Sequence, residues 1–365
     1  MKILYASYSV LPSKSANSVH VSKMSDALYL NGHVVNLCGL TKDICSNKYV
    51  RSFYSISEEV RISRWFRIPG LKNLDYLIFL LFRYISFRPE LIYTRSVFIA
   101  KFFSLFGTKV ILELHSELFD SDVKSIYSIK RSKIVRIVTI STALKKRIME
   151  QLHFLPKDVF CVEHDGVPTS FLNIDAVSTK LKNSVGYIGS LNPGKGVEFL
   201  CSLAHQLPDV EFHIIGGNIN QISELKKKFN SDNIHFHGHL PTNEAQRKMR
   251  EMMILVMPYM KTVNGQNSKI DISKWMSPLK LFEYLASGIP IVTSDLPVIR
   301  EVVDSDTVFF AEPDSLESWT GTIRTVLNDY SAASDKATKG KDIVSYYTWE
   351  ARCSRIIEQV RSLEV

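Results

Sequence analysis

The chain has 365 residues, of which 45% are hydrophobic and 22% are charged. This size and composition are typical of a globular protein with two domains of ordinary size. The five cysteines form no Cys-x-x-Cys pair, which argues against a zinc ribbon and a disulfide framework. No signal peptide and no membrane-spanning run of about 18 apolar residues is recognisable, so we expect a cytoplasmic protein.

Positive charge is concentrated in the first half of the chain. Residues 1–170 contain 24 Lys and Arg against 14 Asp and Glu, a net charge of +10, whereas residues 171–365 have a net charge of −2. A basic surface of this kind suggests an anionic partner.

The first half alternates predicted strands and helices. A strand at 2–10 is followed by a loop of small residues at 13–18, a helix at 19–30 and a strand at 34–40. Further strands are predicted at 91–93, 109–114, 134–140 and 159–163. This alternation favours a parallel sheet that is covered on both faces by helices.

Basic and bulky apolar side chains are interleaved in residues 61–88. The residues that we single out for surface contact are Arg61, Arg64, Trp65, Arg67 and Lys72. Such a mixture fits the interface of an anionic membrane. An ordinary core helix with solvated basic residues is the alternative, and no nucleic-acid-binding motif accompanies the segment.

His115 directly follows the predicted strand at 109–114. Ligands bind at the carboxyl ends of the strands in doubly wound folds. An imidazole at this position can hydrogen-bond a substrate or act as a base. A structural histidine with internal partners is the alternative.

The same alternation restarts at 184–189, after a polar linker near 172–183. Helices are predicted at 196–207 and 221–230. Strands are predicted at 210–215, 234–237, 254–257, 289–293 and 307–310. Two consecutive doubly wound domains would place a ligand crevice at the carboxyl ends of their strands. The final segment, 348–363, is predicted to be an amphipathic helix that packs back on the first domain.

Several polar side chains of the second half suggest ligand chemistry. Lys195 follows an Asn-Pro-Gly turn, where a lysine can neutralise a diphosphate or be merely solvated. His235, His237 and His239 alternate as metal ligands on a strand do, but no fourth ligand accompanies them. The Asp-Ser-Asp triplets at 120–122 and 304–306 are more typical of turns and caps than of a metal site.

Residues 277–292 predict a helix with both ends marked, followed by a buried strand. Ser277 suits the N-cap, Pro278 the first helical position and Gly288 the left-handed end. Free N–H groups at the helix start would bind an anion such as phosphate. Glu283 lies three residues after Lys280 and can accept hydrogen bonds from a sugar diol. The segment therefore suggests a nucleotide site, with a capped structural helix as the alternative.

These motifs, taken together, resemble those of a known enzyme family. They are the Gly-His-Val at 32–34, Leu-Glu-Leu-His at 112–115, Ile-Ser-Thr-Ala at 140–143, His-Asp-Gly-Val-Pro at 164–168, the glycine-rich stretch at 186–196, Ile-Gly-Gly at 215–217 and the segment 277–291. In this order and spacing they resemble the family 4 glycosyltransferases, which are retaining sugar-nucleotide enzymes of the GT-B fold. The resemblance covers nearly the whole chain.

The resemblance implies an α/β GT-B architecture with two Rossmann-like domains facing a central cleft. Residues 1–172 would form the acceptor-binding domain, with the helix at about 346–365 packed back on it. Residues 183–345 would bind the nucleotide-sugar.

The resemblance also implies roles for particular residues. His115, Lys195 and Glu283 would form the catalytic set. The donor-binding residues would be Ser15, Ala16, Gly189, Ser190, Lys195, Gly217, Ser277, Leu279, Lys280 and Glu283. The chain departs from the family at two positions, because Ser190 replaces an arginine on the diphosphate and Trp275 replaces a glutamate on the donor sugar.

The implied function is retaining transfer of a hexosyl or N-acetylhexosaminyl group from a nucleotide-sugar to a glycan. The acceptor would be carried on a polyprenyl diphosphate, in the synthesis of bacterial capsule, O-antigen or exopolysaccharide. The enzyme would need no metal or cofactor, would bind no nucleic acid and would lie peripherally at the inner face of the cell membrane. The alternatives are a catalytically silent lipid- or glycan-binding partner and a soluble enzyme with a small acceptor.

Overall fold

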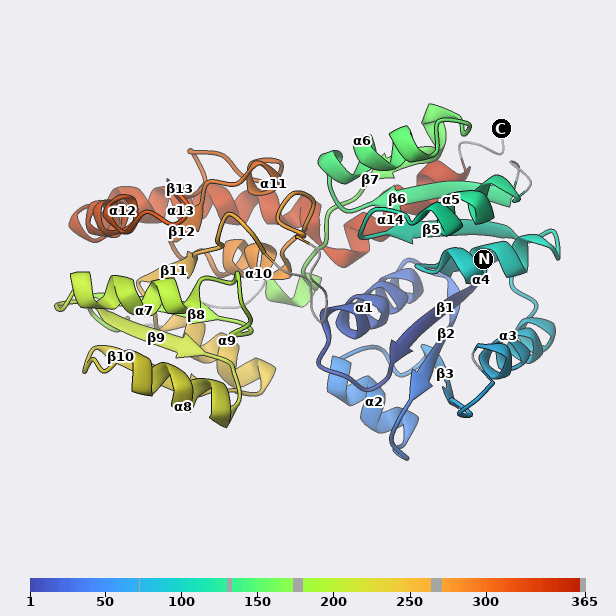
Figure 1. The fold of residues 1–365 in the computed structure, drawn as a ribbon, viewed down its shortest axis with the longest axis horizontal. Coiled ribbons are helices and arrows are strands. Elements are labelled where there is room, and N and C mark those ends of the chain that lie inside the picture. Colours follow the sequence, from blue (N-terminus) through green and yellow to red (C-terminus); the bar gives the residue numbers. More distant parts are fainter. Residues whose placement is uncertain (72, 130–132, 173–179, 264–270, 362–365) are drawn as a thin grey trace. The chain divides into compact units, whose positions relative to one another are not determined.

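The computed structural model describes residues 1–71, 73–129, 133–172, 180–263 and 271–361. The chain forms two compact units (Figure 1). The first comprises Met1–Pro168 with Thr348–Val365, and the second comprises Thr169–Tyr347. Of the residues singled out from the sequence, Lys72 lies outside the described residues.

The first unit is built on a parallel sheet. Within the described residues the strand order is β3-β2-β1-β4-β5-β6-β7. The strands are β1 (Lys2–Val10), β2 (Val34–Thr41), β3 (Arg61–Phe66), β4 (Leu91–Thr94), β5 (Lys109–Leu114), β6 (Ile134–Thr139) and β7 (Phe160–Val162). Ile3, Leu4 and Tyr5 of β1 are all fully buried, as expected for a strand with helices on both faces of its sheet.

Helices cover this sheet. They are α1 (Ala16–Leu30), α2 (Asn47–Tyr54), α3 (Leu74–Phe87), α4 (Val97–Ser104), α5 (Asp120–Tyr127), α6 (Thr142–Gln151) and the C-terminal helix α14 (Trp349–Arg361). Helix α14 packs against α1 and β6, and its Glu350 carbonyl accepts a hydrogen bond from Asn31 Nδ2 at 3.1 Å. Residues from the two ends of the chain thus pack together in the first unit.

The second unit repeats the same architecture. Its parallel sheet has the order β10-β9-β8-β11-β12-β13 within the described residues. The strands are β8 (Ser184–Ile188), β9 (Glu211–Ile215), β10 (Ile234–Gly238), β11 (Ile254–Met257), β12 (Ile291–Ser294) and β13 (Phe309–Ala311). Both sheets confirm the prediction of two doubly wound, Rossmann-like halves.

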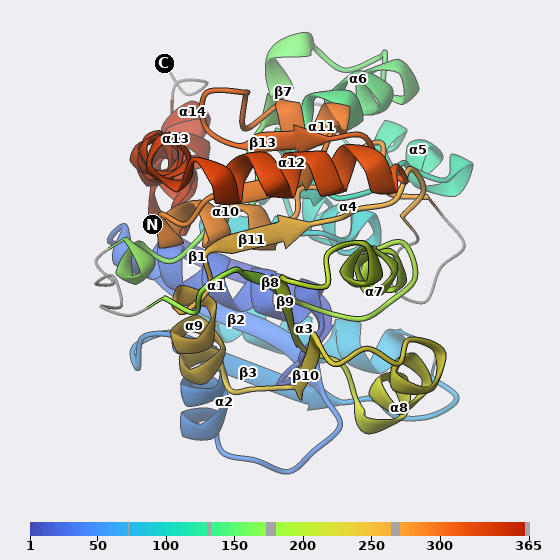
Figure 2. The same ribbon diagram turned by 90° about the vertical axis from the view of Figure 1, so that its left-hand side faces the viewer.

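The helices of the second unit are α7 (Val197–Gln206), α8 (Ile219–Lys228), α9 (Thr242–Arg250), α10 (Leu279–Ser287), α11 (Pro297–Arg300), α12 (Leu316–Asn328) and α13 (Tyr330–Ile343). Helix α12 packs beside β13, and α8 packs beside β10 at the opposite edge of the sheet (Figure 2). The core under α12 includes Tyr187, Phe212 and Trp319, which are all fully buried.

Helix α10 begins one residue later than predicted. Pro278 is the N-cap, with an extended ψ of 112°, and Leu279 is the first helical residue. Ser277 is therefore not the N-cap, and the Pro278 N-cap makes no side-chain capping hydrogen bond. Gly288 ends the helix at φ 64°, as predicted, because glycine adopts the left-handed region without strain.

Candidate functional site

Two lysines of the second unit converge on one aromatic ring. Lys195 precedes α7, and Lys280 is the second residue of α10. Their Nζ atoms lie 4.8 Å and 5.3 Å from the centroid of the Tyr259 ring. The Lys280 Nζ also lies 3.9 Å from the centroid of the Tyr187 ring. The aromatic faces attract both ammonium groups and hold them close to each other.

The positive charge of this lysine pair is poorly compensated. Burial lowers the pKa of Lys195 to about 8. Burial, with the neighbouring charge of Lys195, lowers the pKa of Lys280 well below its usual value. The Lys280 Nζ is buried and has no hydrogen-bond partner among the described residues. Since a buried, unpartnered amine is costly, an anion that binds both lysines would be strongly favoured.

Glycines line the approach to Lys280 at the ends of two strands. Gly189, after β8, has φ +156°, and a Cβ there would lie 2.9 Å from the Lys280 Nζ. Gly216 and Gly217, after β9, have φ +132° and +80°, and a Cβ on Gly216 would lie 1.9 Å from the Gly189 carbonyl oxygen. Only glycines allow these backbones to pack so closely next to the amine.

Helix α10 is fastened to the end of β8 by Tyr284. The Ile188 N–H donates to the Tyr284 hydroxyl at 2.8 Å. This contact fixes α10 at the carboxyl end of the sheet, where Lys280 meets Gly189. The partly exposed Glu283 lies one turn further along α10. Its negative charge raises the pKa of Lys280, but burial lowers that pKa by more.

The structure thus brings three of the predicted donor residues of this unit together. Gly189, Lys195 and Lys280 meet around Tyr187 and Tyr259. Ser190 follows Gly189 with its side chain exposed, and its carbonyl accepts a hydrogen bond from the Tyr187 hydroxyl at 2.7 Å. The two tyrosines were not identified from the sequence, where nothing distinguishes them from other core aromatic residues.

The first unit contains a buried polar cluster around Glu113 of β5. His115 Nε2 lies 2.6 Å from Glu113 Oε1, and Arg352 Nη2 of α14 donates to the same oxygen at 2.9 Å. The Tyr93 hydroxyl donates to Glu113 Oε2 at 2.5 Å. The His20 Nε2 of α1 lies 2.9 Å from Oε1. The carboxylate is therefore surrounded by donors from four other parts of the chain.

These contacts determine the charge states of the cluster. Burial alone would raise the pKa of Glu113, but Arg352 and His20 hold it well below its usual value. Burial and the charge of Arg95 lower the pKa of His115 to about 4. His115 is therefore neutral near pH 7. Because Glu113 is ionised, the Nε2 of His115 donates to it and the Nδ1 carries the lone pair.

The predicted donor residues Ser15 and Ala16 lie at the start of α1. Ser15 caps this helix by accepting from the Ser18 N–H at 3.3 Å, and Ala16 is its first residue. His20, one turn later, packs its ring edge-on against His115 with centroids 4.8 Å apart. Helix α1 thus connects the loop at Ser15 with the histidine cluster. His20 was missed in the sequence because it sits within an ordinary helical pattern.

The residues that could hold a metal ion differ from those considered in the sequence. Among the described residues, the group with suitable geometry is His20, Glu113, His115 and Asp165, whose ligand atoms lie within 4.8 Å of one another. Arg352 already provides positive charge to Glu113 at 2.9 Å. This fixed guanidinium would repel a divalent cation at the same carboxylate. That no metal is required stays a prediction.

The other candidate metal ligands form local contacts. His213 of β9 lies between His235 and His237 of β10, with its Nδ1 3.0 Å from His237 Nε2. His235 Nε2 lies 2.5 Å from Glu211 Oε2. In the first Asp-Ser-Asp triplet, Asp122 accepts a hydrogen bond from the Phe119 N–H at 3.3 Å. In the second, Asp304 accepts a hydrogen bond from the Asp306 N–H at 3.0 Å. Both triplets therefore have the cap and turn roles that their sequence favours.

The predicted surface residues of 61–88 are largely engaged within the first unit. The guanidinium of Arg64 donates to the Leu11 carbonyl at 3.2 Å and to Cys45 Sγ at 2.9 Å. Trp65 Nε1 donates to Asp75 Oδ2 at 3.1 Å. Arg67 Nη2 donates to Asn73 Oδ1 at 2.9 Å, and Arg61 lies over the Phe87 ring at 5.8 Å. The segment is an edge strand and a helix, so its alternating side chains point to different faces.

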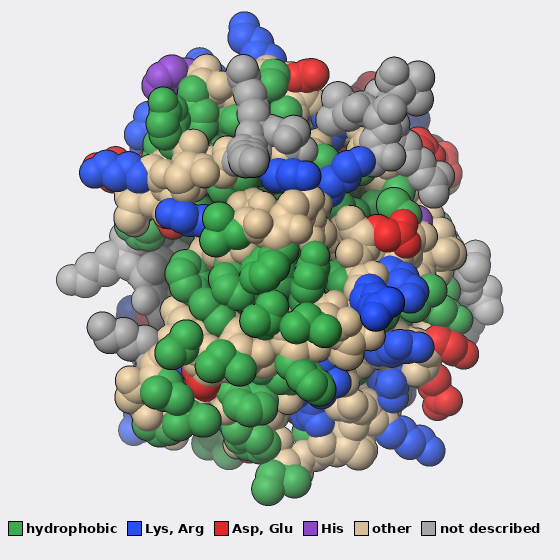
Figure 3. Space-filling model, turned by 90° about the vertical axis from the view of Figure 1, so that its right-hand side faces the viewer, with side chains coloured by type: hydrophobic (Ala, Val, Ile, Leu, Met, Phe, Trp, Pro, Cys, Tyr) green, Lys and Arg blue, Asp and Glu red, His purple; other side chains and the backbone are tan. Residues whose placement is uncertain are grey.

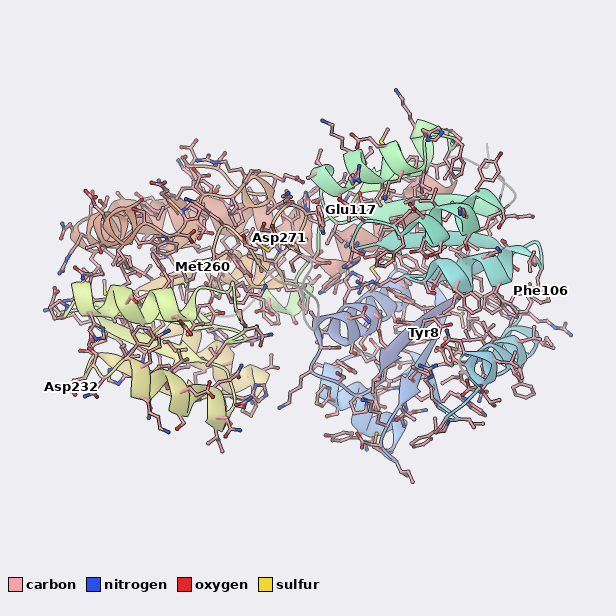
Figure 4. The ribbon with its side chains drawn as sticks, in the orientation of Figure 1. Tyr8, Phe106, Glu117, Asp232, Met260 and Asp271 are labelled. Atoms are coloured by element: carbon pink, nitrogen blue, oxygen red, sulfur yellow. The ribbon has the colours of Figure 1, made fainter. Side chains whose placement is uncertain are left out.

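An exposed apolar face is formed by neighbouring residues instead. On α3 the exposed side chains are Leu74, Ile78, Phe82 and Ile85, and on and after α4 they are Phe98, Leu105 and Phe106. The α3 residues recur with helical spacing and form one stripe. Figure 3 shows hydrophobic side chains gathered on this side of the first unit with Lys and Arg side chains beside them, and Figure 4 labels Phe106 there.

No described helix combines the length and apolar character needed to cross a membrane.

Comparison with known proteins relates the second unit to one family. Residues 182–329 match the family model described as glycosyl transferases group 1. The chain is 24% identical over 179 residues to the sulfoquinovosyl transferase SQD2 of Arabidopsis thaliana, covering 48% of this chain and 32% of that protein. It is 29% identical over 114 residues to the putative teichuronic acid biosynthesis glycosyltransferase TuaH of Bacillus subtilis (strain 168), covering 31% and 27%. The chain thus spans about a third of the length of these curated relatives.

The likeness to solved structures extends over the whole chain. The structure of Anabaena HepE in complex with UDP superposes with a TM-score of 0.73 at 14% identity, covering 99% of this chain and 100% of that one. At this identity the likeness shows the fold, which is GT-B, as predicted from the sequence.

Proposed function

We propose that this chain, which has the GT-B fold and whose residues 182–329 belong to the glycosyl transferases group 1 family, transfers a sugar from a nucleotide-sugar to a glycan. The observation that carries the proposal is the partly buried lysine pair, Lys195 and Lys280, whose charge calls for an anion. A nucleoside diphosphate supplies two adjacent negative groups of the required size. The similar structure of HepE binds UDP, and another structure of it holds UDP and glucose.

In the proposed complex the second unit holds the donor. Lys195 and Lys280 bind the diphosphate, and the backbone amides at the start of α10, beginning at Leu279, donate to its oxygens. Glu283 accepts hydrogen bonds from the ribose hydroxyls. Gly189 allows the Lys280 ammonium to lie against the end of β8, Gly217 allows Leu191 to pack against the end of β9, and Ser277 precedes the anion-binding turn.

The chemistry that follows is electrostatic. The bond between the anomeric carbon and the diphosphate oxygen breaks, and its electron pair remains on the diphosphate. Two lysines and a helix N-terminus stabilise this developing charge, which lets the reaction proceed without a metal ion. The acceptor hydroxyl attacks from the face that the diphosphate leaves and gives its proton to a diphosphate oxygen, so the anomeric configuration is retained.

The first unit is proposed to bind the acceptor and a membrane surface. The apolar stripe of α3 is flanked by basic residues, among them the exposed Arg88 and the Arg83 guanidinium over the Phe82 ring at 5.7 Å. Apolar side chains next to arginines fit the interface of an anionic bilayer. This supports a glycan acceptor on a polyprenyl diphosphate at the inner face of the membrane, in surface-polysaccharide synthesis, and TuaH is named for a comparable pathway.

Nucleotide binding tests this proposal. Calorimetry with UDP, GDP and ADP, in the presence of EDTA, compares the native chain with Lys280→Met and with Lys228→Met as a surface control. We expect one nucleotide to bind. Because a charged hydrogen bond is worth about 1.5–3 kcal/mol, the nucleotide affinity of Lys280→Met should be roughly 10- to 100-fold lower, whereas the affinity of Lys228→Met should be unchanged. If no nucleotide binds, a catalytically silent glycan- or lipid-binding protein becomes the better explanation. If Lys280→Met binds the nucleotide as the native chain does, the lysine pair is not the diphosphate site.

A further inference from the structure

Arg352 is a fully buried guanidinium that the C-terminal helix α14 brings into the first unit. Its Nε donates to the His164 carbonyl at 2.9 Å, and its Nη2 donates to Glu113 Oε1 at 2.9 Å and to the Glu163 carbonyl at 3.2 Å. A buried ion pair of this kind often contributes no more to stability than well-packed apolar residues would. Stability alone therefore gives no clear reason for this pair.

The position of His115 suggests another reason. Glu113 Oε1 binds both the Arg352 guanidinium and the His115 Nε2, so one carboxylate oxygen joins the two side chains. The imidazole of His115 is 19% exposed. Its Nδ1 has no hydrogen-bond partner among the described residues, so this nitrogen is available to a ligand.

We propose that Arg352 is a positioning residue for His115. It keeps Glu113 ionised, Glu113 holds the imidazole with Nε2 protonated, and Nδ1 thereby accepts a hydrogen bond from a hydroxyl of the sugar substrate. This inference rests on the proposed glycosyl transfer for its functional part, but the arrangement of protons can be measured without it.

Loss of Arg352 would reverse the hydrogen bond. Glu113 is fully buried, and without the guanidinium its carboxyl group would become protonated, since burial disfavours the charged form. A neutral carboxylic acid would then donate to His115 Nε2, and the ring proton would move to Nδ1. His115 would present a donor where the substrate requires an acceptor. His20 and Asp165, which also face the cluster, would not restore the original arrangement, because neither replaces the guanidinium next to Glu113 Oε1.

Nitrogen NMR of the full chain tests the arrangement directly. Two-bond proton–nitrogen correlations give the tautomer of His115, with the resonance assigned from His115→Gln. We expect the Nε2–H tautomer in the native chain and in Arg352→Lys, and the Nδ1–H tautomer in Arg352→Met. Arg355→Met is the matched control, because Arg355 lies one turn later on α14 and pairs with Glu163 at 2.8 Å.

Kinetics with the nucleotide-sugar provide the functional readout. A misplaced group in the active site lowers the reaction rate by on the order of 10²-fold. In Arg352→Met, kcat should therefore fall by about this factor, with the donor KM nearly unchanged. Arg352→Lys should recover most of kcat, and Arg355→Met should behave as the native chain.

The NMR result decides the inference. An Nδ1–H tautomer in the native chain, or an Nε2–H tautomer in Arg352→Met, would overturn it. If Arg352→Met does not fold, Arg352→Gln takes its place, because the amide can still donate to the His164 carbonyl. If the tautomers change as expected but the native chain turns over no nucleotide-sugar, the positioning network stands and the proposed function fails.

Discussion

Nucleotide binding should be accompanied by proton uptake at the lysine pair. In the free protein the pKa of Lys195 is about 8, and that of Lys280 is well below its usual value, in both cases mainly because of burial. A bound diphosphate favours the charged form of both amines and raises both pKa values. Each neutral amine therefore gains a proton when the nucleotide binds.

The expected uptake at Lys195 follows from its pKa of about 8. At pH 8 Lys195 is half protonated and gains about 0.5 proton when the diphosphate binds, whereas at pH 7 it is largely charged already and gains little. Lys280, whose pKa is lowered well below its usual value, adds to this uptake. At pH 8 the Lys280→Met variant should therefore take up about 0.5 proton, and the native chain should take up more.

Calorimetry in buffers of different ionisation enthalpy measures this uptake. The slope of the observed binding enthalpy against the buffer ionisation enthalpy gives the number of protons taken up. Nucleotide binding at pH 8 with no proton uptake would show that both lysines are already charged in the free protein. Burial would then not suppress their charge in the free protein, contrary to the lowered pKa values.

Three further predictions concern stability and the surface. Lys280→Met should raise the melting temperature of the nucleotide-free protein, because it removes a buried amine that has no hydrogen-bond partner among the described residues. Scanning calorimetry should show a rise of about 2–4 °C for each kcal/mol gained in the free energy of unfolding. The folded-state pKa of Lys195 is about 8, below its usual 10.5, so the unfolded chain binds more protons between these values. The free energy of unfolding in urea should therefore rise between pH 8 and pH 10 more steeply in the native chain than in Lys195→Met, and equal slopes would contradict the assignment. Phe82→Glu on the α3 stripe should abolish sedimentation of the protein with anionic vesicles. Ile219→Glu, at an 86% exposed position of the second unit, should leave sedimentation unchanged. Vesicle binding that survives Phe82→Glu would place any membrane contact elsewhere.

The repeated architecture could be predicted because its signals are local. Apolar strands alternate with helical patterns in both halves, and the parallel sheets follow from that alternation. The end of α10 was predicted at Gly288 because a left-handed residue there favours glycine. The start was one residue wrong, since serine and proline suit neighbouring cap positions and the sequence does not decide between them.

The exposed apolar side chains of the first unit were less predictable because composition does not show which way a side chain points. Arg64 and Trp65 belong to the edge strand β3, where their polar groups bind Leu11, Cys45 and Asp75. The exposed stripe lies on α3, at positions such as Ile78 that carry no charge signal.

The cluster around Glu113 depends on contacts between distant parts of the chain. His115 could be proposed from its place after a predicted strand, which is where ligands bind in such sheets. Arg352 lies 239 residues from Glu113, and nothing in the local pattern of α14 distinguishes it from a surface arginine. Only the folded structure shows that this guanidinium is buried next to Glu113, which also contacts His115.

The central claim is that the partly buried pair Lys195 and Lys280 binds the diphosphate of a glycosyl donor. The most direct measurement is turnover of the nucleotide-sugar that binds, followed by NMR of the anomeric proton in the first product formed. We predict release of the nucleoside diphosphate with the donor's anomeric configuration retained, and loss of this release in the Lys195→Met/Lys280→Met double variant. Turnover that is unchanged in the double variant, or a first product of inverted configuration, would contradict the account.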